Sequence, residues 1–299
     1  MISRLVAPLA GAVLLAAPIA TLPAQAPRPA TIAGMSTARL ERITPIMQGA
    51  VDSGTIAGAV VLVLRHGQVV YNRAFGWRDR EARIPLRTDA LFRIASQTKA
   101  ITSVAILTLV EEGRLRLNDP VSRFLPSFGS ATVATKTDSG VALLPGRRPI
   151  TIRDLLTHTA GISYGTDSLV AERYRAAGLG PAAGWGWYTA DKAEPICVTM
   201  DRLGTLPFVA QPGSAFVYGY NTDILGCVVE RVSGMPLDRF LAERIFGPLR
   251  MPDTGFFPPP AAAGRLTAVY ARTADRGLYR APDGPLGQGD YLQGPRRSF

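Results

Sequence analysis

Two strand-like segments in the first third of the chain place the strongest constraint on its fold. Ala59–Arg65 and Gln68–Phe75 are rich in Val and Leu, and only His66 and Gly67 separate them. Apolar runs joined by two residues that end in Gly are typical of a β-hairpin, with His66 in the turn. Because a two-stranded hairpin has little stability alone in water, other elements must pack against it.

Helical periodicity precedes the hairpin. Apolar side chains recur there every three or four positions, which predicts an amphipathic helix. These side chains are Leu40, Ile43, Met47 and Val51. Pro45 fits the first turn of a helix but not its interior, so it either kinks this helix or makes Thr44 the N-cap of a shorter one.

Two further helices are expected after the hairpin. The first begins at Ser96, with Gly113 as its stop signal. The second runs from about Asn221 to Val232, and Gly234 closes it.

The remaining segments carry weaker signals. Gly129–Arg148 and Gly165–Ile196 are interpreted as insertions among helices and loops. Beyond Pro252 the chain is dense in Pro and Gly, which predicts loops without another strand or helix.

The charge pattern argues against nucleic-acid binding. The chain has 33 Lys and Arg residues against 23 Asp and Glu residues, a formal net charge of +10. The Arg residues are scattered, with no run longer than the pairs Arg147–Arg148 and Arg296–Arg297. A nucleic-acid surface needs clustered cations, so no nucleic-acid partner is expected. With 47% apolar residues, the composition fits a globular protein with a sizeable core.

The first 26 residues have the pattern of a secretory signal peptide. Arg4 is followed by an apolar stretch from Leu5 to Ala20 and then by Ala24-Gln25-Ala26. We expect cleavage after Ala26, one domain over residues 27–299, and a periplasmic or secreted protein. A retained membrane anchor is the alternative. No later segment has the roughly 18 continuous apolar residues of a membrane span, so no stable membrane insertion is expected after cleavage.

The cysteines and histidines are too few for a metal site. Cys197 and Cys227 can pair in an oxidising compartment, but two buried free thiols fit the sequence equally well. His66 and His158 are the only histidines, which excludes a histidine-rich metal centre. We expect no metal and no cofactor.

Ser96 and Lys99 form the strongest chemical signal. A Ser at the start of a helix and a Lys three residues later project from one face, so the amine can reach the hydroxyl. A serine hydroxyl is too weakly acidic to attack an acyl carbon unaided, and the lysine can take its proton. The helix N-terminus would stabilise the oxyanion that forms on attack. The alternative is an N-capping Ser beside a solvated Lys.

A rival nucleophile is Ser163. The segment Gly161–Gly165 matches the Gly-x-Ser-x-Gly nucleophile elbow of α/β-hydrolases. That fold needs its catalytic His after the Ser in the chain, but both histidines precede Ser163 and no strand-like run leads into it. We therefore interpret this motif as a turn. His158, just upstream, is expected to form structural hydrogen bonds rather than to act as a general base.

Several collinear blocks resemble the serine β-lactamase and penicillin-binding-protein superfamily. Together they extend over roughly residues 36–255. The blocks are Phe92–Lys99, Leu115–Val121, Ile152–Ile162, Gln211–Gly213 and Tyr218–Gly226. The branch they resemble most is the class C β-lactamase-related group, which includes β-lactamase-like esterases and D-alanyl-D-alanine carboxypeptidases. The resemblance implies an α/β (α+β) fold of the β-lactamase/transpeptidase type, with a small antiparallel sheet flanked by helices and a helical lobe.

The resemblance also implies roles for individual residues. Ser96 would be the acylated nucleophile, Lys99 would tune proton transfer, and Tyr218 would shuttle the proton, with its pKa lowered from about 10 by the nearby ammonium. The family's Tyr-x-Asn pattern is not matched, since the amide arrives one residue late, at Asn221, which we expect to bind substrate. This departure favours an esterase or another acyl hydrolase over a β-lactamase. Without the family, Tyr218 is a lining aromatic in a turn and Asn221 is a helix cap.

The resemblance predicts more chain than the sequence contains. Superfamily members carry a Lys or His, a small residue and Gly on a strand near the C-terminus, but no lysine follows Lys192 and no histidine follows His158. We therefore expect a member whose C-terminal strands are missing. The expected activity is acyl transfer to water through an acyl-Ser96 intermediate. Its partner would be a small-molecule or peptide acyl substrate: an ester, a β-lactam or a D-Ala-D-Ala peptide. The alternative is a catalytically incomplete fragment or binding module without turnover.

Overall fold

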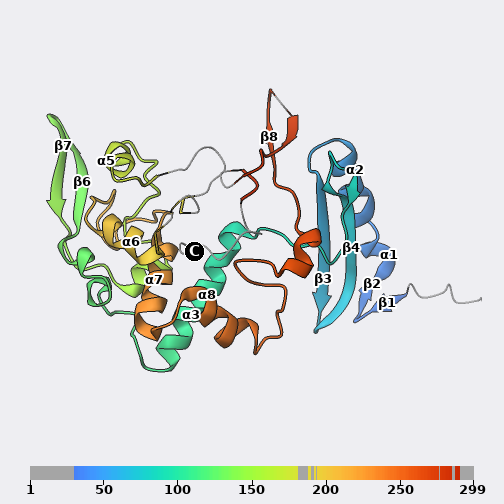
Figure 1. Ribbon diagram of the computed structural model, residues 1–299, viewed down its shortest axis with the longest axis horizontal. Helices are drawn as coiled ribbons and strands as arrows, with labels where there is room; N and C mark the ends of the chain where they lie inside the picture. Colours follow the sequence, from blue (N-terminus) through green and yellow to red (C-terminus); the bar gives the residue numbers. More distant parts are fainter. Residues whose placement is uncertain are drawn as a thin grey trace, which may run out of the picture.

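A computed structural model describes residues 30–180, 188–189, 192, 194–275, 277–284 and 287–289 (Figure 1). A small antiparallel sheet with two short helices lies at one end of the molecule, and a larger group of helices lies beside it. The expected signal peptide, residues 1–26, falls outside the described residues. No helix in the described part of the chain is long and apolar enough to span a membrane.

The predicted hairpin is confirmed and forms most of the sheet. β3 (Gly58–Arg65) pairs antiparallel with β4 (Gln68–Asp79), which pairs on its other side with β5 (Ile84–Pro85). His66 and Gly67 occupy the turn, with φ of 50° and 73°. Both residues therefore have the positive φ that a two-residue type I′ turn requires.

Two helices pack against this hairpin in place of the single expected one. α1 (Thr37–Leu40) ends in a turn, and α2 (Ile43–Asp52) begins after it. Pro45 lies in the first turn of α2, where its missing N–H loses no helical hydrogen bond. The N-cap is Arg42, so the alternative of a Thr44 cap is wrong. The buried side chains between the helices and strands are Leu40, Val70, Tyr71 and Phe75, with Ile43, Met47 and Val51 partly buried against them.

The helical lobe holds the main core. Its helices are α3 (Thr98–Glu111), α4 (Ile152–Leu156), α5 (Ala171–Ala176), α6 (Ile196–Gly204), α7 (Asn221–Ser233) and α8 (Leu237–Leu241). Aliphatic and aromatic side chains from these helices form one continuous buried cluster, in which α3 packs against α7. The two helices expected from the sequence are confirmed as α3 and α7, with Gly113 just beyond α3 and Gly234 capping α7.

Short elements complete the fold. The single turns are η1 (Ala95–Gln97), η2 (Val121–Arg123), η3 (Pro126–Ser130), the π-helical η4 (Ala242–Phe246) and η5 (Pro260–Arg265). The strands outside the main sheet are β1 (Thr31–Ile32), β2 (Met35–Ser36), β6 (Thr132–Thr137), β7 (Gly140–Pro145), β8 (Tyr270–Thr273) and β9 (Gly277–Arg280). They form three two-stranded pairs, β1 with β2, β6 with β7 and β8 with β9.

The last of these pairs corrects the sequence prediction. The chain beyond Pro252 does form strands and a helical turn, contrary to the expectation of loops alone. Its two strands have four residues each, and their stability depends on distant contacts. The Tyr270 hydroxyl accepts a hydrogen bond from the backbone N–H of Arg80 at 2.7 Å and donates one to Glu81 at 2.6 Å. Contacts across about 190 positions leave no trace in local periodicity.

A disulfide joins two helices of the lobe. Cys197 in α6 and Cys227 in α7 are bonded, with their Cα atoms 5.0 Å apart. The sequence left the pairing open because it does not show which side chains meet across the core. The bond fixes α7, which begins at Asn221, to α6.

Candidate active site

Ser96 and Lys99 lie at the N-terminal end of α3, on the face predicted from their spacing. Ser96 is exposed in η1, and Lys99 follows in the first turn of α3. The ammonium Nζ of Lys99 donates to Ser96 Oγ at 3.2 Å. The N-cap of α3 is Gln97, not Ser96, so the alternative of a capping Ser beside a solvated Lys does not describe this site.

Tyr218 approaches the same serine from a distant part of the chain. Its hydroxyl lies 2.6 Å from Ser96 Oγ, across 122 positions in sequence. The Nζ of Lys99 also lies over the Tyr218 ring, 4.7 Å from its centroid. The structure thus brings together all three residues that the sequence nominated for catalysis.

The electrostatic environment favours ionisation of Tyr218. Partial burial raises the pKa of the phenol, but the hydrogen bonds from Lys99 and Ser96 and the positive charge of Lys99 outweigh it. The Tyr218 pKa therefore lies below its ordinary value. A phenol with a lowered pKa next to an exposed serine hydroxyl is suited to accept that hydroxyl's proton.

The loop that carries Tyr218 is held by the segment that follows α4. The backbone N–H groups of Val217 and Gly213 donate to the carbonyls of His158 and Thr159, at 2.7 and 2.8 Å. Gly219 fits only because it has no side chain, since a Cβ there would lie 2.2 Å from the carbonyl oxygen of Ile162. This close approach fixes the position of Tyr218 relative to α4.

A buried carboxylate stabilises that segment in turn. Asp154 accepts two hydrogen bonds from the Arg148 guanidinium, at 2.6 and 2.8 Å, and completes a capping box with Thr151 at the start of α4. Burial raises the pKa of Asp154, but the hydrogen bonds from Arg148 and Thr151 prevail and hold it below its ordinary value.

Asn221 does not lie where a substrate could reach it. Its side chain is fully buried, and its Nδ2 lies 2.9 Å from Nδ1 of His158. The expectation of a substrate-binding Asn221 is therefore corrected to an internal hydrogen-bonding role. The N-cap of α7 is Tyr220, so Asn221 is not the cap either. His158 forms the structural hydrogen bond that the sequence analysis expected.

The Gly161–Gly165 motif forms a turn, as interpreted from the sequence. Ser163 is only 4% exposed, and its Oγ accepts a hydrogen bond from the backbone N–H of Gly165 at 3.1 Å. A buried hydroxyl that is turned toward its own backbone cannot meet a substrate. Ser163 is thus not a rival to the exposed Ser96.

Asp223 is a site residue that the sequence analysis did not nominate. It lies in the first turn of α7, and burial raises its pKa to about 6 against the opposing charge of Lys99. Its charge raises the pKa of Tyr218, so it opposes the effect of Lys99 on the phenol. The available signal was an acidic residue five positions after Tyr218, in the first turn of the helix expected from Asn221.

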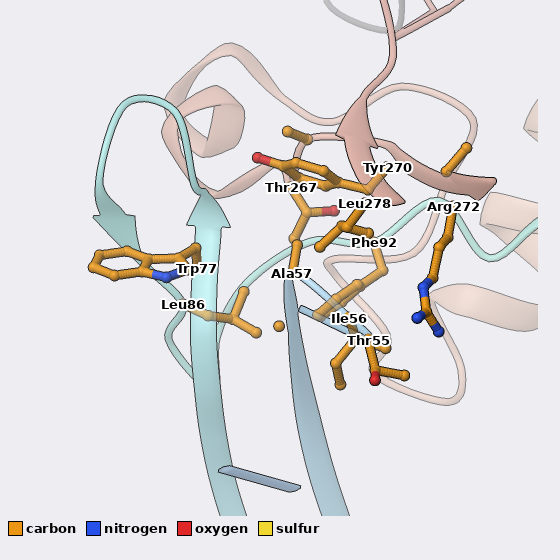
Figure 2. Close-up of a pocket in the computed structure, with 13 residues that line it drawn as sticks. Thr55, Ile56, Ala57, Trp77, Leu86, Phe92, Thr267, Tyr270, Arg272 and Leu278 are labelled. Carbon is orange, nitrogen blue, oxygen red and sulfur yellow. The ribbon is translucent and has the colours of Figure 1, made fainter. Parts of the chain in front are cut away.

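A separate cavity of about 310 Å³ lies between the sheet and the C-terminal hairpin (Figure 2). Ile56, Leu86 and Phe92 contribute apolar walls, and Tyr270 and Arg272 come from β8. Ser96, Lys99 and Tyr218 are not among its lining residues. The candidate catalytic groups therefore lie outside this cavity.

Comparison with known families agrees with this geometry. The family model described as Beta-lactamase matches residues 43–291. The chain belongs to the beta-lactamase family. The fold is accordingly the β-lactamase/transpeptidase type that the sequence blocks implied, with mixed helices and small antiparallel sheets.

Relatives in this family include esterases. Esterase EstB of Burkholderia gladioli is 37% identical over 216 residues, which cover 72% of this chain and 51% of EstB. The lovastatin esterase of Penicillium rubens is 35% identical over 235 residues, covering 77% and 56%. The solved structure of EstCE1, a hydrolase with promiscuous acyltransferase activity, superposes with a TM-score of 0.69 at 33% identity, covering 82% of this chain and 59% of that one. The chain spans about half the length of the curated relatives it matches.

Proposed function

We propose that this protein is a serine hydrolase that cleaves carboxylic esters through an acyl-Ser96 intermediate. The observation that carries the proposal is the contact of an exposed Ser96 Oγ with both the Tyr218 hydroxyl, at 2.6 Å, and the Lys99 ammonium, at 3.2 Å. A hydroxyl held between a proton acceptor and a cation is the arrangement of an activated nucleophile.

The proposed reaction has two proton-transfer stages. Tyr218, as phenolate, takes the proton of Ser96 while Oγ bonds to the acyl carbon, and the protonated phenol then passes that proton to the departing alkoxide. In the second stage Tyr218 takes a proton from water, which attacks the acyl carbon, and returns it to Ser96 Oγ as the acyl bond breaks. Lys99 stabilises the phenolate throughout.

The N-terminal end of η1 and α3 supports the developing negative charge. Its backbone N–H groups carry the positive end of the helix dipole, and Ser96 lies within this first turn. Stabilisation of an oxyanion by such donors is worth about 3 kcal/mol for each donor in serine hydrolases.

An ester is the substrate class favoured here over a β-lactam or a D-Ala-D-Ala peptide. Two curated relatives are named esterases, at 37% and 35% identity. The buried Asn221 also leaves the site without the exposed amide that the family's Tyr-x-Asn pattern supplies. Both observations support cleavage of a simple ester.

Export is part of the proposal. Residues 1–26 would direct the chain to the periplasm or out of the cell and be removed after Ala26. The bond between Cys197 and Cys227 supports this location, because disulfides persist in oxidising compartments. N-terminal sequencing of protein from the periplasmic and culture fractions tests it, and a chain that keeps Met1 in the cytoplasm would contradict it.

A substrate panel tests the activity. Wild type, Ser96→Ala, Tyr218→Phe and Ser163→Ala are assayed with p-nitrophenyl acetate, nitrocefin and a D-Ala-D-Ala peptide. We expect turnover of the ester, none above background for Ser96→Ala, and a loss of about 100-fold to 10,000-fold for Tyr218→Phe. Ser163→Ala is the control and should retain activity. Ester cleavage that survives Ser96→Ala would contradict the proposal, and acylation without turnover would favour the alternative of a binding module.

A further inference from the structure

The side-chain amide of Asn221 has a fixed orientation. Its Nδ2 lies 3.2 Å from the carbonyl oxygen of Val217, 3.4 Å from that of Ile162 and 2.9 Å from Nδ1 of His158. Carbonyl oxygens only accept hydrogen bonds, so the donor end of the amide must face them. The reverse orientation would place Asn221 Oδ1 against two other oxygens.

This orientation determines the tautomer of His158. Because Asn221 Nδ2 is a donor, Nδ1 of His158 must be the acceptor, and the imidazole proton must be on Nε2. Asn221 Oδ1 is buried and has no hydrogen-bond partner among the described residues. In this orientation Oδ1 accepts no hydrogen bond from the described part of the chain, while Nδ2 faces His158 and the two carbonyl oxygens.

His158 contacts Tyr218 directly as well. The two rings lie 4.8 Å apart between centroids, tilted by 32°, and the carbonyl of His158 accepts the N–H of Val217 at 2.7 Å. His158 has φ of 56°, in the left-handed region that glycine adopts with least strain. Its backbone and its ring thus both hold the loop that ends at Tyr218.

We propose that His158 and Asn221 form a brace that positions the Tyr218 hydroxyl on Ser96, and that the brace holds only while His158 is neutral. A proton on Nδ1 would turn the acceptor into a donor that faces the donor Nδ2 of Asn221. The imidazole would then move, and the Tyr218 ring packed on it would move with it. This inference rests on the proposed function, in which Tyr218 transfers the proton of Ser96.

The charges around the brace keep His158 neutral at neutral pH. Burial lowers the pKa of His158, and the positive charge of Lys99 on α3 lowers it further. The other titratable groups at this place are Tyr218 in the adjoining loop and Asp223 in the first turn of α7, both of which interact with the same Lys99. Because the folded pKa is below the ordinary value of about 6.5, the brace is intact above that pH and is released only as the pH falls through the folded value.

Nitrogen-15 NMR of histidine-labelled protein tests the tautomer without any need for activity. The chain has two histidines, so His66→Asn, in the exposed hairpin turn, assigns the spectrum and serves as the control. We expect the His158 signals of an Nε2–H imidazole and titration of His158 below pH 6.5. In a second sample labelled with carbon-13 tyrosine and assigned with Tyr218→Phe, we expect the Tyr218 ring signals to shift with that titration. An Nδ1–H imidazole, or Tyr218 signals indifferent to that titration, would overturn the brace.

Kinetics of ester cleavage test the positioning. His158→Phe keeps a ring but removes the acceptor, and we expect kcat to fall about 100-fold with little change in KM, since the attacking groups are displaced rather than the substrate. His158→Gln offers Oε1 to Asn221 but does not titrate. We expect its activity to lie within about tenfold of wild type, and we expect it to lack the fall in kcat at acid pH that protonation of His158 causes in wild type. A kcat equal to that of wild type in His158→Phe, or the same fall in kcat at acid pH in His158→Gln as in wild type, would overturn the inference. Absence of Ser96 acylation in wild type would instead refute the proposed function, and the NMR result would still decide on the brace.

Discussion

Removal of the disulfide between α6 and α7 has an effect whose size follows directly from the structure. The bond between Cys197 and Cys227 closes a loop with a sequence separation of 30 residues. A cross-link over a loop of that length restricts the unfolded chain and stabilises the folded state by about 3.6 kcal/mol at 25 °C. We expect the Cys197→Ala/Cys227→Ala variant to lose about that free energy of unfolding.

Urea denaturation followed by circular dichroism measures this loss. For a slope of about 3 kcal/mol per M, the midpoint should fall by about 1.2 M. The slope should also rise, because the unfolded chain without the cross-link exposes more surface. Wild type reduced with dithiothreitol is the matched control, since it keeps both buried sulfur atoms and loses only the bond.

Two results would contradict a stabilising disulfide of this size. A midpoint shift below about 0.3 M in the reduced wild type, with an unchanged slope, would mean that the bond hardly restricts the unfolded chain. Reaction of both Cys197 and Cys227 with a thiol reagent in denaturant, before any reduction, would mean that the bond is absent.

Two further predictions concern the segment that supports Tyr218. Asp154→Asn should cost about 1–3 kcal/mol of stability, because it removes the buried acceptor of two charge-assisted hydrogen bonds while the Arg148 guanidinium, with 42% of its side chain exposed, stays solvated. Since the folded pKa of Asp154 is lowered, its contribution to stability is complete above the ordinary pKa of about 4 and is lost as the pH falls through the folded value. The free energy of unfolding of wild type should therefore fall more steeply below about pH 4 than that of the variant, and equal slopes would contradict the argument. Gly161→Ala should lower the free energy of unfolding strongly, because its Cβ would lie 2.0 Å from the carbonyl oxygen of Ala210. Gly113→Ala is the control: its φ is similarly positive but nothing lies within 4 Å of the added Cβ, so it should cost only about 1–2 kcal/mol. Equal losses of stability in thermal denaturation would contradict the steric argument.

Local signals were sufficient to predict the elements that depend on neighbours in sequence. The β3–β4 hairpin follows from two apolar runs and a His66-Gly67 turn, and α3 follows from apolar spacing that ends at Gly113. The approach of Lys99 to Ser96 is likewise local, since three positions along a helix bring two side chains to one face.

The features that local sequence patterns did not predict depend on contacts between residues far apart in the chain. Tyr218 meets Ser96 across 122 positions, and only the family resemblance pointed to it. The burial of Asn221 depends on the carbonyls of Ile162 and Val217, which no side-chain pattern reveals. The β8–β9 hairpin is similar, because the hydrogen bonds of Tyr270 to Arg80 and Glu81, just after β4, stabilise strands too short to show a period.

Intact mass spectrometry after exposure to a fluorophosphonate identifies the nucleophilic serine. We expect one covalent adduct per chain, mapped to Ser96 by peptide analysis, absent in Ser96→Ala and formed more slowly in Tyr218→Phe. Adduct formation at Ser163, or undiminished labelling of Ser96→Ala, would contradict the assignment of Ser96 as the nucleophile.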